Sequence, residues 1–189
     1  MCMGISLSLG LLLLRLVAGL TIAAHGAQKL FGWFGGPGLA GTMKMQERMG
    51  LKPYVLWASF VILGELGGGL SLALGFLTPL GAAGIFGAMS MAIAKSHWKN
   101  GFWNSKRGIE FPLQLLAAAM ALGLTGPGSY SLDALFGISL PAPLLFLILA
   151  LVALLVDIVG LAIGRAAAPA AAPASPPATT QSEPRPGAP

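Results

Sequence analysis

Two basic side chains, His25 and Lys29, stand four positions apart near the end of the first apolar segment. In a helix this spacing places both on one face. A histidine changes its protonation state near neutral pH, and an ammonium group donates hydrogen bonds. The pair is therefore a candidate for hydrogen bonding or proton transfer to a bound molecule. Compensation of the helix dipole by Lys29 is the structural alternative.

Similar chemistry recurs at the ends of two later apolar segments, where His97 ends the third and Glu110 begins the fourth. Antiparallel helices would bring these ends to the same membrane surface as His25. The candidates for a catalytic, proton-transferring role are His25, Lys29 and Glu110. Flat aromatic rings and amides nearby would hold a cofactor. The candidate cofactor-binding residues are Gln28, Trp33, His97, Trp103 and Asn104.

An opposite pair of charges lies deeper in the apolar segments. Arg15 and Glu65 stand at similar distances from the inner ends of the first and second segments, which places both near the membrane midplane. An unpaired charge at that depth costs several kcal/mol. We therefore predict an intramembrane Arg15–Glu65 ion pair. It would either pin two helices together or form a polar floor, relay or gate.

Other cofactor and metal chemistry has weaker support. Two histidines on different helices allow bis-histidine haem b ligation, but no other feature favours haem. No Cys/His/Asp set has the spacing of metal ligands, so no metal site is assigned. Cys2 is the only cysteine, which excludes a structural disulfide within the chain. Asp157 lies near Arg165 in the last apolar segment, and we expect its carboxylate to reach the inner surface.

Long apolar segments must position these residues. Of the 189 residues, 56% are hydrophobic and 9% are charged, whereas about a quarter of residues are charged in a soluble domain. Several segments reach the roughly 17–25 residues that a membrane-spanning helix needs. From this composition we expect one membrane domain and no soluble catalytic domain. The net charge of +5 comes from short loops and does not indicate nucleic-acid binding.

We predict an all-α membrane protein with a four-helix transmembrane bundle and a fifth, C-terminal transmembrane helix. The bundle occupies residues 1–136, with spans at about 5–27, 54–74, 79–96 and 110–125. An additional unit at 137–165 holds the fifth span, at about 144–163. The Pro- and Ala-rich residues 166–189 cannot bury enough apolar surface to fold, and we expect a disordered tail.

The distribution of basic residues predicts the orientation. The loops at 75–79 and 126–143 carry no lysine or arginine. Cytoplasmic loops are enriched in these residues, so we expect a multi-pass protein of the cell (inner) membrane with its N-terminus outside and its C-terminus in the cytoplasm. The basic residues expected on the cytoplasmic side are Lys29, Lys44, Arg48, Lys52, Lys95, Lys99, Lys106, Arg107, Arg165 and Arg185.

Several short stretches resemble the DoxX family of small integral membrane proteins. The first, AHGAQKLFG at residues 24–32, includes His25 and Lys29, and the second, ELGGG at 65–69, includes Glu65. The others are NGFWN at 100–104, GIEFP at 108–112 and YSLD at 130–133. The resemblance extends over residues 8–136, with the stretches in the family's order and at similar spacing.

The resemblance implies a four-helix membrane bundle linked to redox complexes, among them a thiosulfate:quinone oxidoreductase subunit, and to quinone or oxidative-stress tolerance. We therefore expect a membrane subunit of a redox or oxidative-stress-related complex that binds a quinone or similar small aromatic at the cytoplasmic face. A small-solute permease and a purely structural or assembly protein are the alternatives. The fifth span and the tail depart from the four-helix pattern.

The resemblance also bears on catalysis and partners. The chain lacks thiol pairs, cluster ligands and a nucleotide-binding motif, so a partner or the quinone itself would supply the electron chemistry. Whether the chain catalyses a step, as the membrane subunit of a quinone-linked oxidoreductase, stays open. The expected partners are the lipid bilayer, a soluble or membrane redox protein and a second copy of the chain, without nucleic acid.

Overall fold

The structure, a computed structural model, describes residues 2–166, which form helices and turns without a strand. The helices are α1 (Cys2–Phe31), α2 (Gly38–Arg48), α3 (Tyr54–Ile62), α4 (Gly68–Leu74), α5 (Thr78–Ala92), α6 (Glu110–Thr125), α7 (Leu132–Leu135) and α8 (Ala142–Ala166). Single π-helical turns at Leu63–Gly67 and Ile93–His97 join α3 to α4 and extend α5. Short 3-10 turns occupy Trp33–Gly35, Trp98–Asn100 and Asn104–Lys106.

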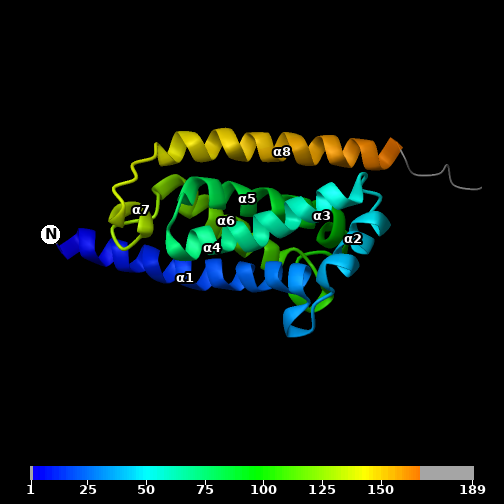
Figure 1. The fold of residues 1–189 in the computed structure, drawn as a ribbon, viewed down its shortest axis with the longest axis horizontal. Helices are drawn as coiled ribbons and strands as arrows, with labels where there is room; N and C mark the ends of the chain where they lie inside the picture. Colours follow the sequence, from blue (N-terminus) through cyan, green and yellow to red (C-terminus); the bar gives the residue numbers. More distant parts are fainter. Residues whose placement is uncertain (1, 167–189) are drawn as a thin grey trace, which may run out of the picture.

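The long helices pack as a bundle with α1 and α8 on opposite sides. Figure 1 shows the α3–α4 rod, α5 and α6 between these two flanking helices. Helix α1 packs chiefly on α4, and α5 packs on both α6 and α8. The core contains small and branched side chains such as Ile22, Leu72, Ile85 and Leu122, with Phe146 of α8 buried against them. The arrangement confirms the predicted all-α membrane protein.

Three helical segments of the described chain have the length and apolarity to cross a membrane. They are Gly4–Phe31, Tyr54–Leu74 and Ala142–Gly164. Helix α6 is apolar but shorter, with 16 residues, or about 24 Å against a hydrocarbon core of about 30 Å. The helices lie close to the predicted spans. The five crossings and the three-part division of the chain stay predictions, and residues 167–189, with the predicted tail, lie outside the described part.

Glycines determine how closely the second segment approaches its neighbours. A Cβ added to Gly69 would lie 2.5 Å from the backbone nitrogen of Ala23 and 2.7 Å from the carbonyl oxygen of Gly19. On the opposite side, a Cβ on Gly64 would lie 2.7 Å from the carbonyl oxygen of Gly84. Small residues allow such backbone contact between membrane helices. These contacts fix the register of α1 against α4, and of the π-helical turn Leu63–Gly67 against α5.

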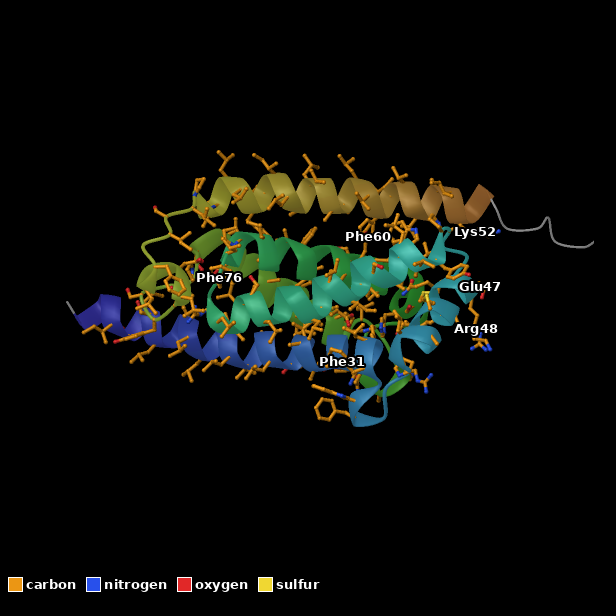
Figure 2. The ribbon with its side chains drawn as sticks, viewed as in Figure 1. Phe31, Glu47, Arg48, Lys52, Phe60 and Phe76 are labelled. Atoms are coloured by element: carbon orange, nitrogen blue, oxygen red, sulfur yellow. The ribbon has the colours of Figure 1, made fainter. Side chains whose placement is uncertain are left out.

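Charged residues gather at one end of the bundle. Glu47, Arg48 and Lys52 lie there in Figure 2, and Phe76 lies toward the other end. At the charged end, the ammonium group of Lys95 donates a hydrogen bond to the carbonyl oxygen of Met49 (3.0 Å). The chain therefore has one charged end and one uncharged turn between α4 and α5. Which end faces the cytoplasm stays a prediction.

Candidate functional site

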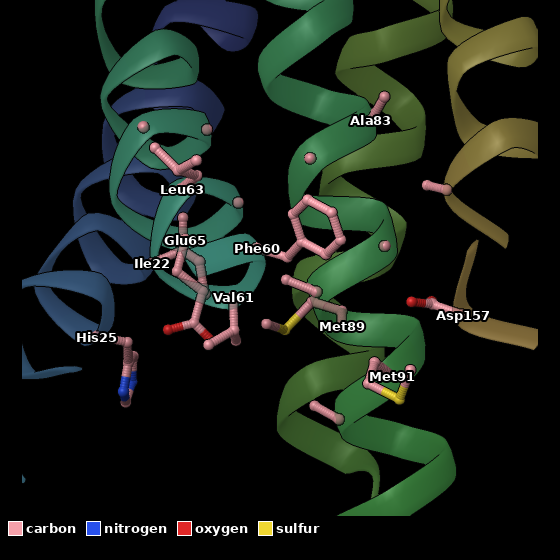
Figure 3. A pocket seen from close by; sticks show the side chains of 18 of the residues that line it. Ile22, His25, Phe60, Val61, Leu63, Glu65, Ala83, Met89, Met91 and Asp157 are labelled. Carbon is pink, nitrogen blue, oxygen red and sulfur yellow. The ribbon is translucent and has the colours of Figure 1, made fainter. Parts of the chain in front are cut away.

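A cavity of about 860 Å³ lies among α1, the α3–α4 rod, α5, α6 and α8. Its walls are mostly apolar, with aromatic rings, methionines and several glycines. Figure 3 shows His25 and Glu65 on one side of the cavity and Asp157 on another, with Phe60 and Met89 between them. A concave apolar site with a few polar groups is the usual form of a small-molecule site.

Lys29 and Glu65 form an ion pair in the wall of this cavity. The side chain of Glu65 is 4% exposed and that of Lys29 is 18% exposed. Glu65 lies in the π-helical turn Leu63–Gly67, and such turns are frequent at functional sites. The carbonyl of Lys29 also accepts a hydrogen bond from the Thr42 hydroxyl (2.9 Å), which fastens α2 to the end of α1. The pair therefore has a fixed position.

His25 lies one helical turn before Lys29 and also lines the cavity. Its half-buried ring packs on the ring of Phe111, with centroids 5.3 Å apart and an interplanar angle of 58°. This contact orients the imidazole from the α6 side. The ring can donate or accept a hydrogen bond according to its tautomer. Sequence reasoning missed Phe111, because the pattern of an apolar segment does not distinguish a cavity wall from a lipid-facing side chain.

His97 is the second histidine of the cavity. Its Nδ1 atom lies 2.7 Å from the carbonyl oxygen of Arg107, which also accepts a hydrogen bond from the Asn100 amide (3.0 Å). A carbonyl only accepts, so Nδ1 carries the hydrogen and donates it. In the neutral ring, Nε2 is then an acceptor. His97 lines the cavity together with His25 and Lys29.

Five of the predicted catalytic and cofactor-binding residues lie outside the cavity lining: Gln28, Trp33, Trp103, Asn104 and Glu110. The Gln28 amide donates to the carbonyl of Phe34 (3.4 Å), within the turn that follows α1. Trp33 is 57% exposed and packs on Phe31 with ring centroids 4.9 Å apart. Gln28 and Trp33 thus make contacts at the end of α1 and in the turn that follows it. His25 and Lys29 line the cavity, and Gln28 and Trp33 do not.

Glu110 stabilises its own loop. Its carboxylate accepts a hydrogen bond from the backbone nitrogen of Asn104 (2.8 Å). Trp103 is 62% exposed and packs edge-on against Phe102. The prediction that Glu110 joins His25 at one site therefore needs correction, because this carboxylate is used to close the turn before α6. Of the residues of α6, the two that line the cavity are Phe111 and Pro112, which follow Glu110 directly.

The predicted Arg15–Glu65 ion pair is wrong. Arg15 is fully buried, and its Nη2 atom donates to the carbonyl of Tyr130. Its guanidinium occupies the place where a Cβ of Gly75 would lie. Gly75 stands ten positions after Glu65, or about 15 Å along the helix. The glycine contacts of α1 and α4 set this register, which pairs Glu65 with Lys29 instead and removes the gate proposed for a permease.

Asp133 organises the opposite end of the bundle. Its carboxylate accepts hydrogen bonds from the backbone nitrogens of Leu77 (2.8 Å) and Thr78 (3.2 Å), and from the Thr78 hydroxyl (3.1 Å). It is 3% exposed. The carboxylate thereby ties α7 to the start of α5. Neither Arg15 nor Asp133 lines the cavity.

The carboxylate of Asp157, which we expect at the inner surface, belongs to a buried side chain in the structure. It is 7% exposed and lines the cavity from α8. The aromatic residues Trp57 and Phe60 line the same cavity from α3. A carboxylate inside an otherwise apolar span was the available signal. Within the described residues, no group of three or more His, Cys, Asp or Glu is arranged to hold a metal ion.

The family model described as DoxX matches residues 10–98. The inner membrane protein YqjF of Escherichia coli (strain K12) is 35% identical over 106 residues, which cover 55% of this chain and 78% of that protein. No solved structure matches the chain. The matched residues 10–98 include four ionisable residues of the cavity: His25, Lys29, Glu65 and His97.

Proposed function

Because the chain belongs to the DoxX family of membrane proteins, we propose that it binds a quinone or similar small aromatic in this cavity, as the membrane subunit of a redox complex. The observation that carries the proposal is the arrangement of His25 and the Lys29–Glu65 pair on mostly apolar walls. The name of the relative, an inner membrane protein, supports the cell membrane as the location.

The cavity chemistry suits both oxidation states of a quinone. The apolar walls would hold the ring, and Phe111 would pack beside it. A quinone carbonyl accepts hydrogen bonds, which His25 and Lys29 can donate, and a hydroquinone hydroxyl donates one, which Nε2 of His97 can accept. Reduction of a quinone takes up electrons and protons together. The partner redox protein would supply the electrons, and His25 and the Lys29–Glu65 pair would exchange the protons.

Binding of decylubiquinone to the detergent-purified chain tests this proposal. His25→Ala is expected to weaken binding about tenfold, because it removes a hydrogen bond and the ring that packs on Phe111. Gln28→Ala is the matched control, since Gln28 lies one turn further along α1 and outside the cavity. The control is expected to bind as the natural chain does. Unchanged binding by His25→Ala would contradict the proposed site.

A further inference from the structure

Asp157 is a buried carboxylate for which no side chain of residues 4–164 is a partner. It is 7% exposed, and its Oδ2 atom makes no hydrogen bond there. Among the side chains that the structure describes, those of residues 4–164, the ion pair joins Lys29 to Glu65 and does not involve Asp157. The side chain lines the cavity, and Figure 3 shows its carboxylate directed inward. An ionised carboxylate in this environment is stabilised by a cation or a hydrogen-bond donor.

The packing of α8 fixes where Asp157 lies. One turn earlier, α8 approaches α5, since a Cβ on Gly87 would lie 3.0 Å from the Cβ of Ala153. One turn later, the indole ring of Trp57 occupies the place where a Cβ of Gly160 would lie. The carboxylate therefore lies between these two contacts, at the seam where α8 meets both α3 and α5. Neither contact supplies a polar group.

Two aromatic rings complete this part of the cavity. Trp57 is buried at 8% exposure, and Phe60 is 44% exposed. Their ring centroids are 5.8 Å apart at an interplanar angle of 88°. Tryptophan faces attract cations more strongly than other rings do. A carboxylate beside a tryptophan in an apolar wall is complementary to a positive charge on an apolar body.

We propose that Asp157, Trp57 and Phe60 form a binding site for a hydrophobic organic cation, an amine with an aromatic or aliphatic body that arrives from the bilayer. The ammonium group donates to Asp157, and the apolar body lies against Phe60 and Trp57. Lys95, a cation of the neighbouring segment, is committed to the carbonyl of Met49. This inference goes beyond the quinone proposal, which rests on His25 and Lys29 across the cavity, so each can fail without the other.

The first test uses the natural chain in detergent and needs no variant. Equilibrium binding of radiolabelled 2-phenylethylamine is compared with that of 2-phenylethanol, a neutral ligand of nearly the same size. The amine is expected to bind at least tenfold more tightly, because only the ammonium group pairs with the carboxylate. Equal affinity for the two ligands would overturn the proposal, whatever the result with decylubiquinone.

The second test removes the charge. Asp157→Asn keeps the shape of the side chain and is expected to weaken amine binding at least tenfold while leaving binding of 2-phenylethanol within twofold. Glu47→Gln makes the same chemical change at an exposed position of α2 and is the control. Amine affinity equal to that of the natural chain in Asp157→Asn would overturn the site. Decylubiquinone binding is measured on the same samples. If it falls in His25→Ala and not in Asp157→Asn, the two proposals concern separate sites.

Discussion

Replacing Lys29 with methionine is expected to lower the free energy of unfolding by about 3 kcal/mol, because it leaves Glu65 buried without its partner. The carboxylate is 4% exposed, so water cannot replace the lost ammonium group. Glu65 also forms part of the cavity wall, so a change in its position would change the cavity. The measurement is reversible unfolding in mixed detergent micelles, with decylubiquinone binding measured on the same preparation. Binding of decylubiquinone should fall as well.

Two further variants distinguish a broken pair from a lost side chain. Lys29→Met combined with Glu65→Met removes both charges and should restore much of the stability, since a buried pair contributes little net energy over apolar replacements. Lys44→Met removes an exposed lysine of α2 and should change stability by less than about 0.5 kcal/mol. A double variant no more stable than Lys29→Met would show that the two charges do not act as a pair.

Gly69→Ala is expected to lower the free energy of unfolding by a similar amount, about 3 kcal/mol, because the added methyl group must push α1 and α4 apart. The added Cβ would lie 2.5 Å from the backbone nitrogen of Ala23 and 2.8 Å from a side-chain carbon of Ile22. Backbone atoms cannot move aside as a flexible side chain can, which places the cost at the upper end for overpacking. The same unfolding assay measures it.

Gly67 provides the matched control on the same stretch of chain. A Cβ there meets nothing within 4 Å, so Gly67→Ala should leave stability unchanged or raise it by up to about 1 kcal/mol through helix propensity. Equal losses in both variants would indicate a general need for flexible backbone in residues 64–69. In that case the α1–α4 contact would not be what Gly69 provides.

The helices could be predicted from the sequence because hydropathy and breaking residues mark their ends directly. The second predicted span, 54–74, coincides with the rod Tyr54–Leu74, and the fourth, 110–125, coincides with α6. The first helix is longer than predicted and continues to Phe31. Glycines 32 and 35, both with positive φ, end it there rather than near Ala27. This extension keeps Lys29 on the helix.

The charge pairing could not be predicted, since it depends on register. Arg15 and Glu65 have complementary charges, but the sequence does not show that Gly19 and Gly69 will touch. That contact sets the register of the two helices. In this register Glu65 lies beside Lys29, and Arg15 lies beside the turn at Gly75. Close packing of small residues therefore outweighed a pairing that depth alone suggested.

Several polar residues of the cavity could be predicted from the sequence, and its aromatic residues could not. His25, Lys29 and His97 could be chosen because polar groups at helix ends are conspicuous against apolar surroundings. Trp57 and Phe111 could not, because an aromatic ring in an apolar span packs against lipid, core or ligand alike. The exposed aromatic residues Trp33 and Trp103 drew attention for the opposite reason, although their rings pack on loop neighbours.

Photolabelling with an azidoquinone, followed by peptide mass spectrometry, tests the central claim most directly. If the cavity binds a quinone, the label should appear on cavity-lining peptides of α1, the α3–α4 rod, α5 and α6, around His25, Val61, Met89 and Phe111, and excess decylubiquinone should suppress it. Labelling confined to the loop aromatics Trp33 and Trp103, or labelling that decylubiquinone does not suppress, would contradict the claim.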